Sequence, residues 1–106
     1  MQLPDYSKLQ LPGVPEPWFI APEDLRSDLL RELRTEIGAG HALDGRRLVA
    51  VAKCGGCDDA IFTVEDTDPV QWVRVHLTWS GSTEASPWPR TEVFLEPHDA
   101  FANHTH

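Results

Sequence analysis

The chain has 106 residues, a formal net charge of −8 and 41% hydrophobic residues, values that fit one globular domain. Its acidity argues against binding to nucleic acid or an anionic membrane, because both attract clusters of Lys and Arg. No apolar run approaches the roughly 20 residues of a membrane helix, and the first residues lack the regions of a secretory signal. We therefore expect a single cytoplasmic domain, residues 1–106, whose acidic charge either favours a basic protein partner or simply keeps the protein soluble.

Residues 1–21 are rich in proline, which excludes a helix and favours extended backbone. The apolar run Trp18-Phe19-Ile20 indicates that this segment packs against the body of the domain. We therefore predict an extended N-terminal arm anchored by these three residues.

Residues 22–37 have the spacing of an amphipathic helix. Pro22 suits the first helical position, and Gly38 is placed to end the helix. Apolar side chains recur every three or four residues and form one stripe, made of Leu25, Leu29, Leu30, Leu33 and Ile37. The stripe predicts a helix that buries one face.

Four apolar segments are predicted strands: 48–53, 60–64, 72–79 and a shorter one at 91–95. Short connections between the first three predict antiparallel pairing of successive strands. We therefore expect an α+β fold, in which the N-terminal helix packs on an antiparallel meander of three to four strands. Residues 96–106 carry at most one turn of helix near 99–101 and are predicted to be a weakly ordered tail.

The third predicted strand alternates more regularly than any other segment. Val73, Val75, Leu77 and Trp79 share one face, and Trp72, Arg74, His76 and Thr78 share the other. We predict that the valine face meets the helix, and that the opposite face points outward or lies under the N-terminal arm. An indole, a guanidinium and an imidazole on one accessible face are typical of a partner-binding surface.

Two further features could contribute to a site. His76 is either a general base or a sheet-face histidine bonded to Thr63 or Glu65, and no Gly-x-Ser-x-Gly elbow supplies it with a nucleophile. In the segment Pro87-Trp88-Pro89, two prolines stiffen the backbone around a tryptophan. Trp88 is therefore either an interface anchor or a cap folded back onto the sheet.

Cys54-Gly55-Gly56-Cys57 has two thiols at the spacing of half a zinc site or of a redox dithiol. Structural zinc takes four ligands and the chain has no second Cys-x-x-Cys, so histidines would have to complete the site. A redox pair would need a helix N-terminus beside it, whereas this motif connects two predicted strands. We expect reduced thiols in a hairpin and no cofactor, with zinc bound by Cys54 and Cys57 as the alternative.

Three stretches, Cys57 to Phe62, Val75 to Trp79 and Pro87 to Pro89, resemble a group of small bacterial proteins. That group has an acidic pair before an apolar strand, a His-Leu-Thr-Trp strand and a Trp-Pro loop. The resemblance covers about residues 41–95. Small acidic proteins of this layout resemble the immunity partners of bacterial toxins.

We therefore predict a non-enzymatic protein-binding module, most concretely an acidic immunity-type inhibitor of a bacterial toxin. The predicted partner-binding residues are Trp72, Arg74, His76 and Trp88. The alternative is a small metal-binding protein or metal-dependent enzyme that uses Cys54, Cys57 and His76. The lack of a complete catalytic constellation in the sequence favours the first hypothesis.

Overall fold

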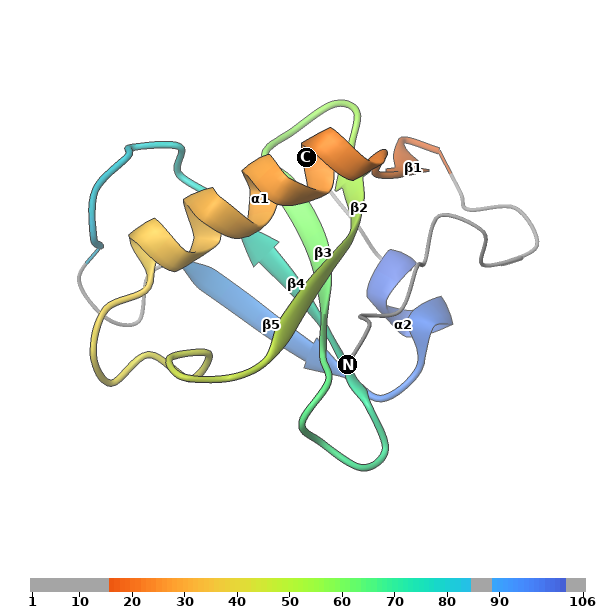
Figure 1. Ribbon diagram of the computed structural model, residues 1–106. Helices are drawn as coiled ribbons and strands as arrows, with labels where there is room; N and C mark the ends of the chain where they lie inside the picture. Colours follow the sequence, from red (N-terminus) through yellow and green to blue (C-terminus); the bar gives the residue numbers. More distant parts are fainter. Residues whose placement is uncertain (1–15, 85–88, 103–106) are drawn as a thin grey trace.

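The computed structural model describes residues 16–84 and 89–102, so residues 1–15 of the predicted arm, Trp88 and residues 103–106 lie outside the described residues. The elements follow one another as β1 (Trp18–Ile20), α1 (Glu23–Glu36), β2 (Leu48–Cys54), β3 (Asp59–Val64), β4 (Gln71–His76), β5 (Arg90–Phe94) and α2 (Pro97–Phe101). The strands form one five-stranded antiparallel sheet in the order β1-β2-β3-β4-β5 (Figure 1).

The α+β class and the antiparallel meander are confirmed. The predicted number of strands, three to four, is wrong because Trp18–Ile20 pairs with the end of β2 and adds a strand. This strand also precedes the helix, so α1 is not the first element of the described chain.

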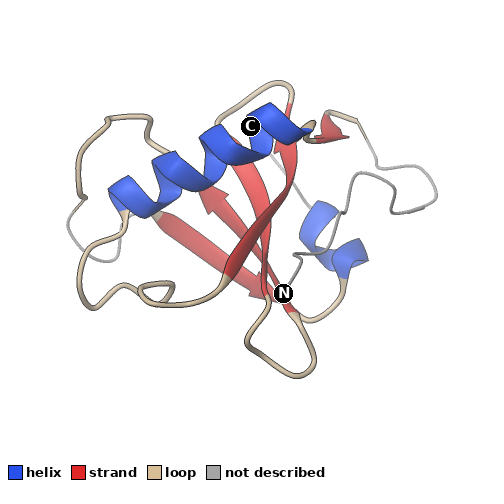
Figure 2. Cartoon of the chain, in the orientation of Figure 1, coloured by secondary structure: helices blue, strands red, loops and turns tan. Residues whose placement is uncertain are grey.

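The long helix α1 lies across one face of the sheet (Figure 2). Its Leu29 and Leu33 are fully buried against the side chains of Phe62, Val73 and Val75 from the central strands. The helix ends where Ile37 turns into extended backbone, with its N–H still bonded to the carbonyl of Leu33 at 3.0 Å. The apolar stripe of the sequence therefore packs as predicted.

The opposite face of the sheet has its own apolar cluster. The short helix α2 buries Ala100 and Phe101 there, and the ring of Trp18 meets that of Phe101 edge-on at 5.7 Å. Ile61 and Trp72 of the sheet complete the contact. The turn of helix expected near 99–101 thus belongs to a packed element. Within residues 16–84 and 89–102, no helix is both long and apolar enough to cross a membrane.

Candidate functional site

The predicted binding face of β4 is largely closed. Only 8% of Trp72 and 7% of Arg74 are exposed, because α2 lies over them. The guanidinium of Arg74 donates to the carbonyls of Ala100 (3.0 Å) and Ala102 (2.9 Å) and pairs with the carboxylate of Glu92 at 3.2 Å. A cation on the last carbonyls of a helix stabilises its C-terminal end. The expectation that this face points outward is therefore wrong for Trp72 and Arg74. The alternative, that it lies under the N-terminal arm, holds in part, because Trp18 of the arm packs in the same cluster as Trp72 beside α2.

His76, at the end of β4, stays exposed, as does Thr78 beyond the strand. Its Nδ1 lies 2.7 Å from Oδ1 of Asp59, the residue directly opposite on β3. The partners expected for this ring were Thr63 and Glu65, but the register places both further along β3 or beyond it. A carboxylate-oriented imidazole can move a proton. Acyl transfer would also require a nucleophile within its reach, and no contact of this ring supplies one in the described part of the chain.

The two cysteines lie beside this pair, at the hairpin between β2 and β3. Cys54 is buried and Cys57 is partly buried, and neither forms a disulfide. Lys53 Nζ donates to the carbonyls of Cys54 and Cys57 and holds the hairpin together. Burial, the hydrogen bond with Cys54 and the charge of Asp59 raise the pKa of the Cys57 thiol to about 11. Since the thiolate is the nucleophile and the metal ligand, this environment weakens both roles.

A metal site was the alternative that combined Cys54, Cys57 and His76. Across residues 16–84 and 89–102, no group of three or more His, Cys, Asp and Glu side chains is arranged to hold a metal ion. The hairpin does bring Cys57 and His76 to the same end of the sheet, where Asp59 contacts both.

The most unusual backbone lies just after β4. The predicted strand 72–79 ends at His76 instead, and Trp79 has a φ of 56°, the one positive φ among the described non-glycine residues. The left-handed region costs a bulky residue about 1–3 kcal/mol, so the surroundings must impose it.

Glu36, the last residue of α1, imposes this turn. Its side chain is fully buried, and its carboxylate accepts the N–H of Thr78 at 2.9 Å and that of Trp79 at 2.9 Å. Burial and a hydrogen bond with Glu32 raise the pKa of Glu36, while the two N–H donors act in the opposite direction. Hydrogen bonds from backbone N–H to a carboxylate are about twice as strong as neutral ones. They offset the strained backbone of Trp79.

Further contacts fix the rest of this segment, residues 77–84, which we name the Trp79 loop. Gly81 N–H donates to Glu32 at 3.1 Å, and Glu84 N–H donates to the carbonyl of Glu36 at 2.8 Å. Within the loop, the hydroxyl of Thr78 donates to Glu84 at 2.8 Å. Figure 1 shows the loop beside the C-terminal end of α1. The Trp79 loop is therefore a fixed extension of the helix.

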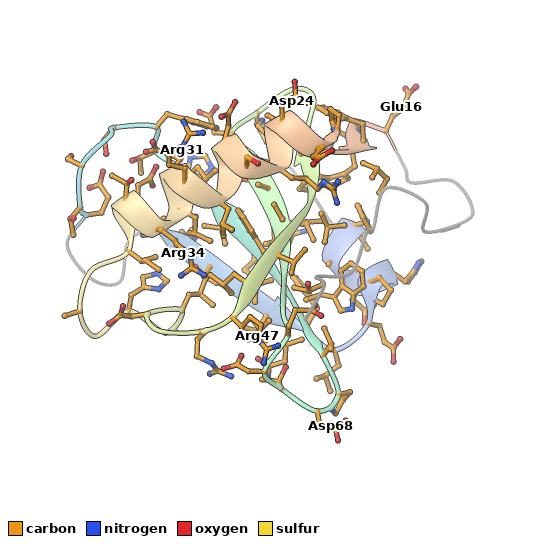
Figure 3. All side chains as sticks on the ribbon, in the orientation of Figure 1. Glu16, Asp24, Arg31, Arg34, Arg47 and Asp68 are labelled. Atoms are coloured by element: carbon orange, nitrogen blue, oxygen red, sulfur yellow. The ribbon has the colours of Figure 1, made fainter. Side chains whose placement is uncertain are left out.

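This fixed loop leaves its aromatic side chain at the surface, since 42% of Trp79 is exposed. Two cations of α1, labelled in Figure 3, have partners of their own: Arg31 pairs with Asp28 at 3.0 Å and Arg34 donates to the carbonyl of Arg46. The sequence reasoning placed Trp79 on the buried face and did not single out Glu36. The one indication of a special role for Glu36 in the sequence was its place in the last turn of a helix, where cations are preferred.

Comparisons with protein-family models, curated proteins and solved structures found no match for this chain. The resemblance to small bacterial proteins and to toxin-immunity partners therefore stays a prediction.

Proposed function

We propose that this chain is a protein-binding module and that the Trp79 loop is its docking surface. One observation carries the proposal: a buried carboxylate holds Trp79 in a strained backbone conformation, yet the indole remains exposed. Tryptophan is enriched among the residues that dominate binding energy, and a side chain presented on fixed backbone loses less entropy on binding.

The charges favour a basic partner. The chain carries a net charge of −8. Besides the buried Glu36, the carboxylates of Glu32 on α1 and of Glu84 within the loop accept hydrogen bonds from the Trp79 loop. Acidic groups around an apolar anchor speed the encounter with a basic surface. The partner would supply an apolar pocket for the indole with cations around it, and an immunity-type inhibitor of a basic toxin is the concrete form of this proposal.

The predicted binding residues differ in whether a partner could reach them. His76 is exposed and remains available to a partner, whereas Trp72 and Arg74 are buried under α2. The metal-dependent alternative has less support, because the surroundings of Cys57 disfavour its thiolate. Trp79 therefore replaces Trp72 as the aromatic anchor.

The proposal is tested by affinity capture from host lysate with the full chain and with two variants, followed by binding measurements with the recovered protein. Trp79→Ala should weaken the complex by about 2 kcal/mol, roughly 30-fold in Kd. Phe19→Ala is the matched control, since Phe19 on β1 is an aromatic side chain of equal exposure, 41%. Association should also slow as salt is added. A complex that tolerates Trp79→Ala as well as Phe19→Ala would rule out this docking surface.

A further inference from the structure

β5 is the last strand of the sheet, and β4 is its single neighbour among the described strands. A strand edge exposes backbone N–H and C=O groups that can pair with another strand. The large apolar side chains with the highest exposure are Val93 (53%), on this strand, and Leu95 (61%), directly after it. Val93 pairs with the buried Val73, so it continues the core face of the sheet beyond the area that α1 covers. The open edge of the sheet at β5 therefore also carries exposed apolar side chains.

We propose that β5 of a second copy of this chain pairs with β5, edge to edge and antiparallel, around a twofold axis at Val93. Such an interface is isologous, so one strand must complement itself. Pro89 and Pro97, which cannot donate a backbone hydrogen bond, bracket residues 90–96, and Val93 is the centre of that window. The sheet would then run continuously through both copies. This inference is independent of the proposed function.

The side chains complement one another in this register. Val93 lies opposite Val93 of the second copy, and Thr91 lies opposite its Leu95, which covers the exposed apolar strip. β5 ends at Phe94, and Glu96 precedes α2 with extended backbone (φ −117°, ψ 139°), so the dimer would extend the strand by two residues. On the other face, Arg90 would then lie opposite Glu96 of the second copy, one ion pair at each end of the interface. Directly opposed side chains have Cβ atoms about 4.5–5.5 Å apart, close enough for these pairs to interact.

Neighbouring registers lack this complementarity. A twofold axis at Glu92 places two glutamates opposite each other, and an axis at Phe94 places Glu92 opposite Glu96. An axis at Thr91 pairs Arg90 with Glu92 of the second copy, but it leaves Val93 facing Pro89. Like charges directly opposite destabilise a strand pair, which disfavours the axes at Glu92 and Phe94. The axis at Val93 is preferred over that at Thr91 because it brings the two exposed valines together.

The net charge gives the dimer a salt dependence of its own. Each copy carries −8, so the two copies repel at a distance, and added salt screens that repulsion. Self-association should therefore strengthen as salt rises, whereas binding to a basic partner should weaken. The opposite signs separate this proposal from the proposed function.

The experiment is sedimentation equilibrium of the full chain, from micromolar to millimolar concentration and at low and high salt. Wild type should show a monomer–dimer equilibrium. Val93→Lys puts two lysines at the axis and should raise the dissociation constant at least about 10-fold. Phe19→Lys is the control, because it introduces the same charge at an exposed apolar position on β1, at the opposite edge of the sheet, and should leave the equilibrium unchanged.

A charge exchange tests the register itself. Arg90→Glu should weaken the dimer, and Arg90→Glu combined with Glu96→Arg should restore it, with circular dichroism showing that each variant stays folded. Restoration requires that Arg90 and Glu96 face each other across the axis. A chain that stays monomeric at every concentration would overturn the proposal. So would a dimer that responds equally to Val93→Lys and Phe19→Lys, or one that the double exchange fails to restore.

Discussion

Replacing Glu36 with alanine should destabilise the protein through the Trp79 loop. The carboxylate accepts hydrogen bonds from two backbone donors, the N–H groups of Thr78 and Trp79. An unsatisfied buried donor costs about 1–3 kcal/mol, which gives roughly 2–6 kcal/mol for the pair. Two effects reduce this value: water can reach the donors once the loop moves, and relaxation of Trp79 releases about 1–3 kcal/mol of backbone strain. We therefore expect a net loss of about 2–3 kcal/mol in the free energy of unfolding.

Urea unfolding at neutral pH, followed by circular dichroism, measures this loss as a shift of the midpoint at constant slope. Asp44→Ala is the control, since it removes one negative charge from an exposed position and should stay within about 0.5 kcal/mol of wild type. If Glu36→Ala behaves like Asp44→Ala, the carboxylate does not hold the Trp79 loop, and the support for the proposed docking surface is lost.

Four further outcomes follow from the same contacts. Burial raises the pKa of Glu36 above 4.5, so protonation of this carboxyl favours the folded state. This proton-linked part of the stability, which is separate from the hydrogen bonds that the loop donates, is present below pH 4.5 and lost as pH rises through the folded-state pKa; Glu36→Gln should remove it from the pH dependence of unfolding. Trp79→Gly should be more stable than Trp79→Ala in thermal unfolding, by about 1 kcal/mol, because glycine adopts a positive φ without strain. Alkylation of Cys57 by iodoacetamide should stay slow at neutral pH and accelerate only toward its pKa of about 11. Leu33→Ala should cost about 2–5 kcal/mol in urea unfolding, and a cost near zero would contradict its burial under α1.

The helix and the central strands could be predicted because their periodicity is local. Leu29 and Leu33 recur at helical spacing, and Val73 and Val75 alternate along a strand, so each sequence segment carries the pattern of the face that it buries. The glycines and prolines between the segments mark the turns. Such patterns depend on a few neighbouring residues, and one sequence is enough to read them.

The site could not be predicted in the same way, because its contacts join distant parts of the chain. Glu36 meets Thr78 and Trp79 across more than 40 residues, and nothing in the local sequence around Trp79 indicates a left-handed turn. Alternation showed that Trp79 belongs to the face of Val75, provided that the strand continues. The buried carboxylate ends the strand after His76, and the indole therefore turns outward.

The error over Trp72 and Arg74 has a related cause. Alternation assigns residues to two faces, but it cannot tell which face a later segment will cover. Five residues of α2 are too few to form a stable helix alone, so their helical structure depends on packing, and its main polar contact is the guanidinium of Arg74. Arg74, which suggested a binding surface, thus binds α2 instead. The bound helix then buries the arginine. For an arginine on a sheet face, free backbone carbonyls from the same chain compete with any partner, and here the intramolecular contact prevails.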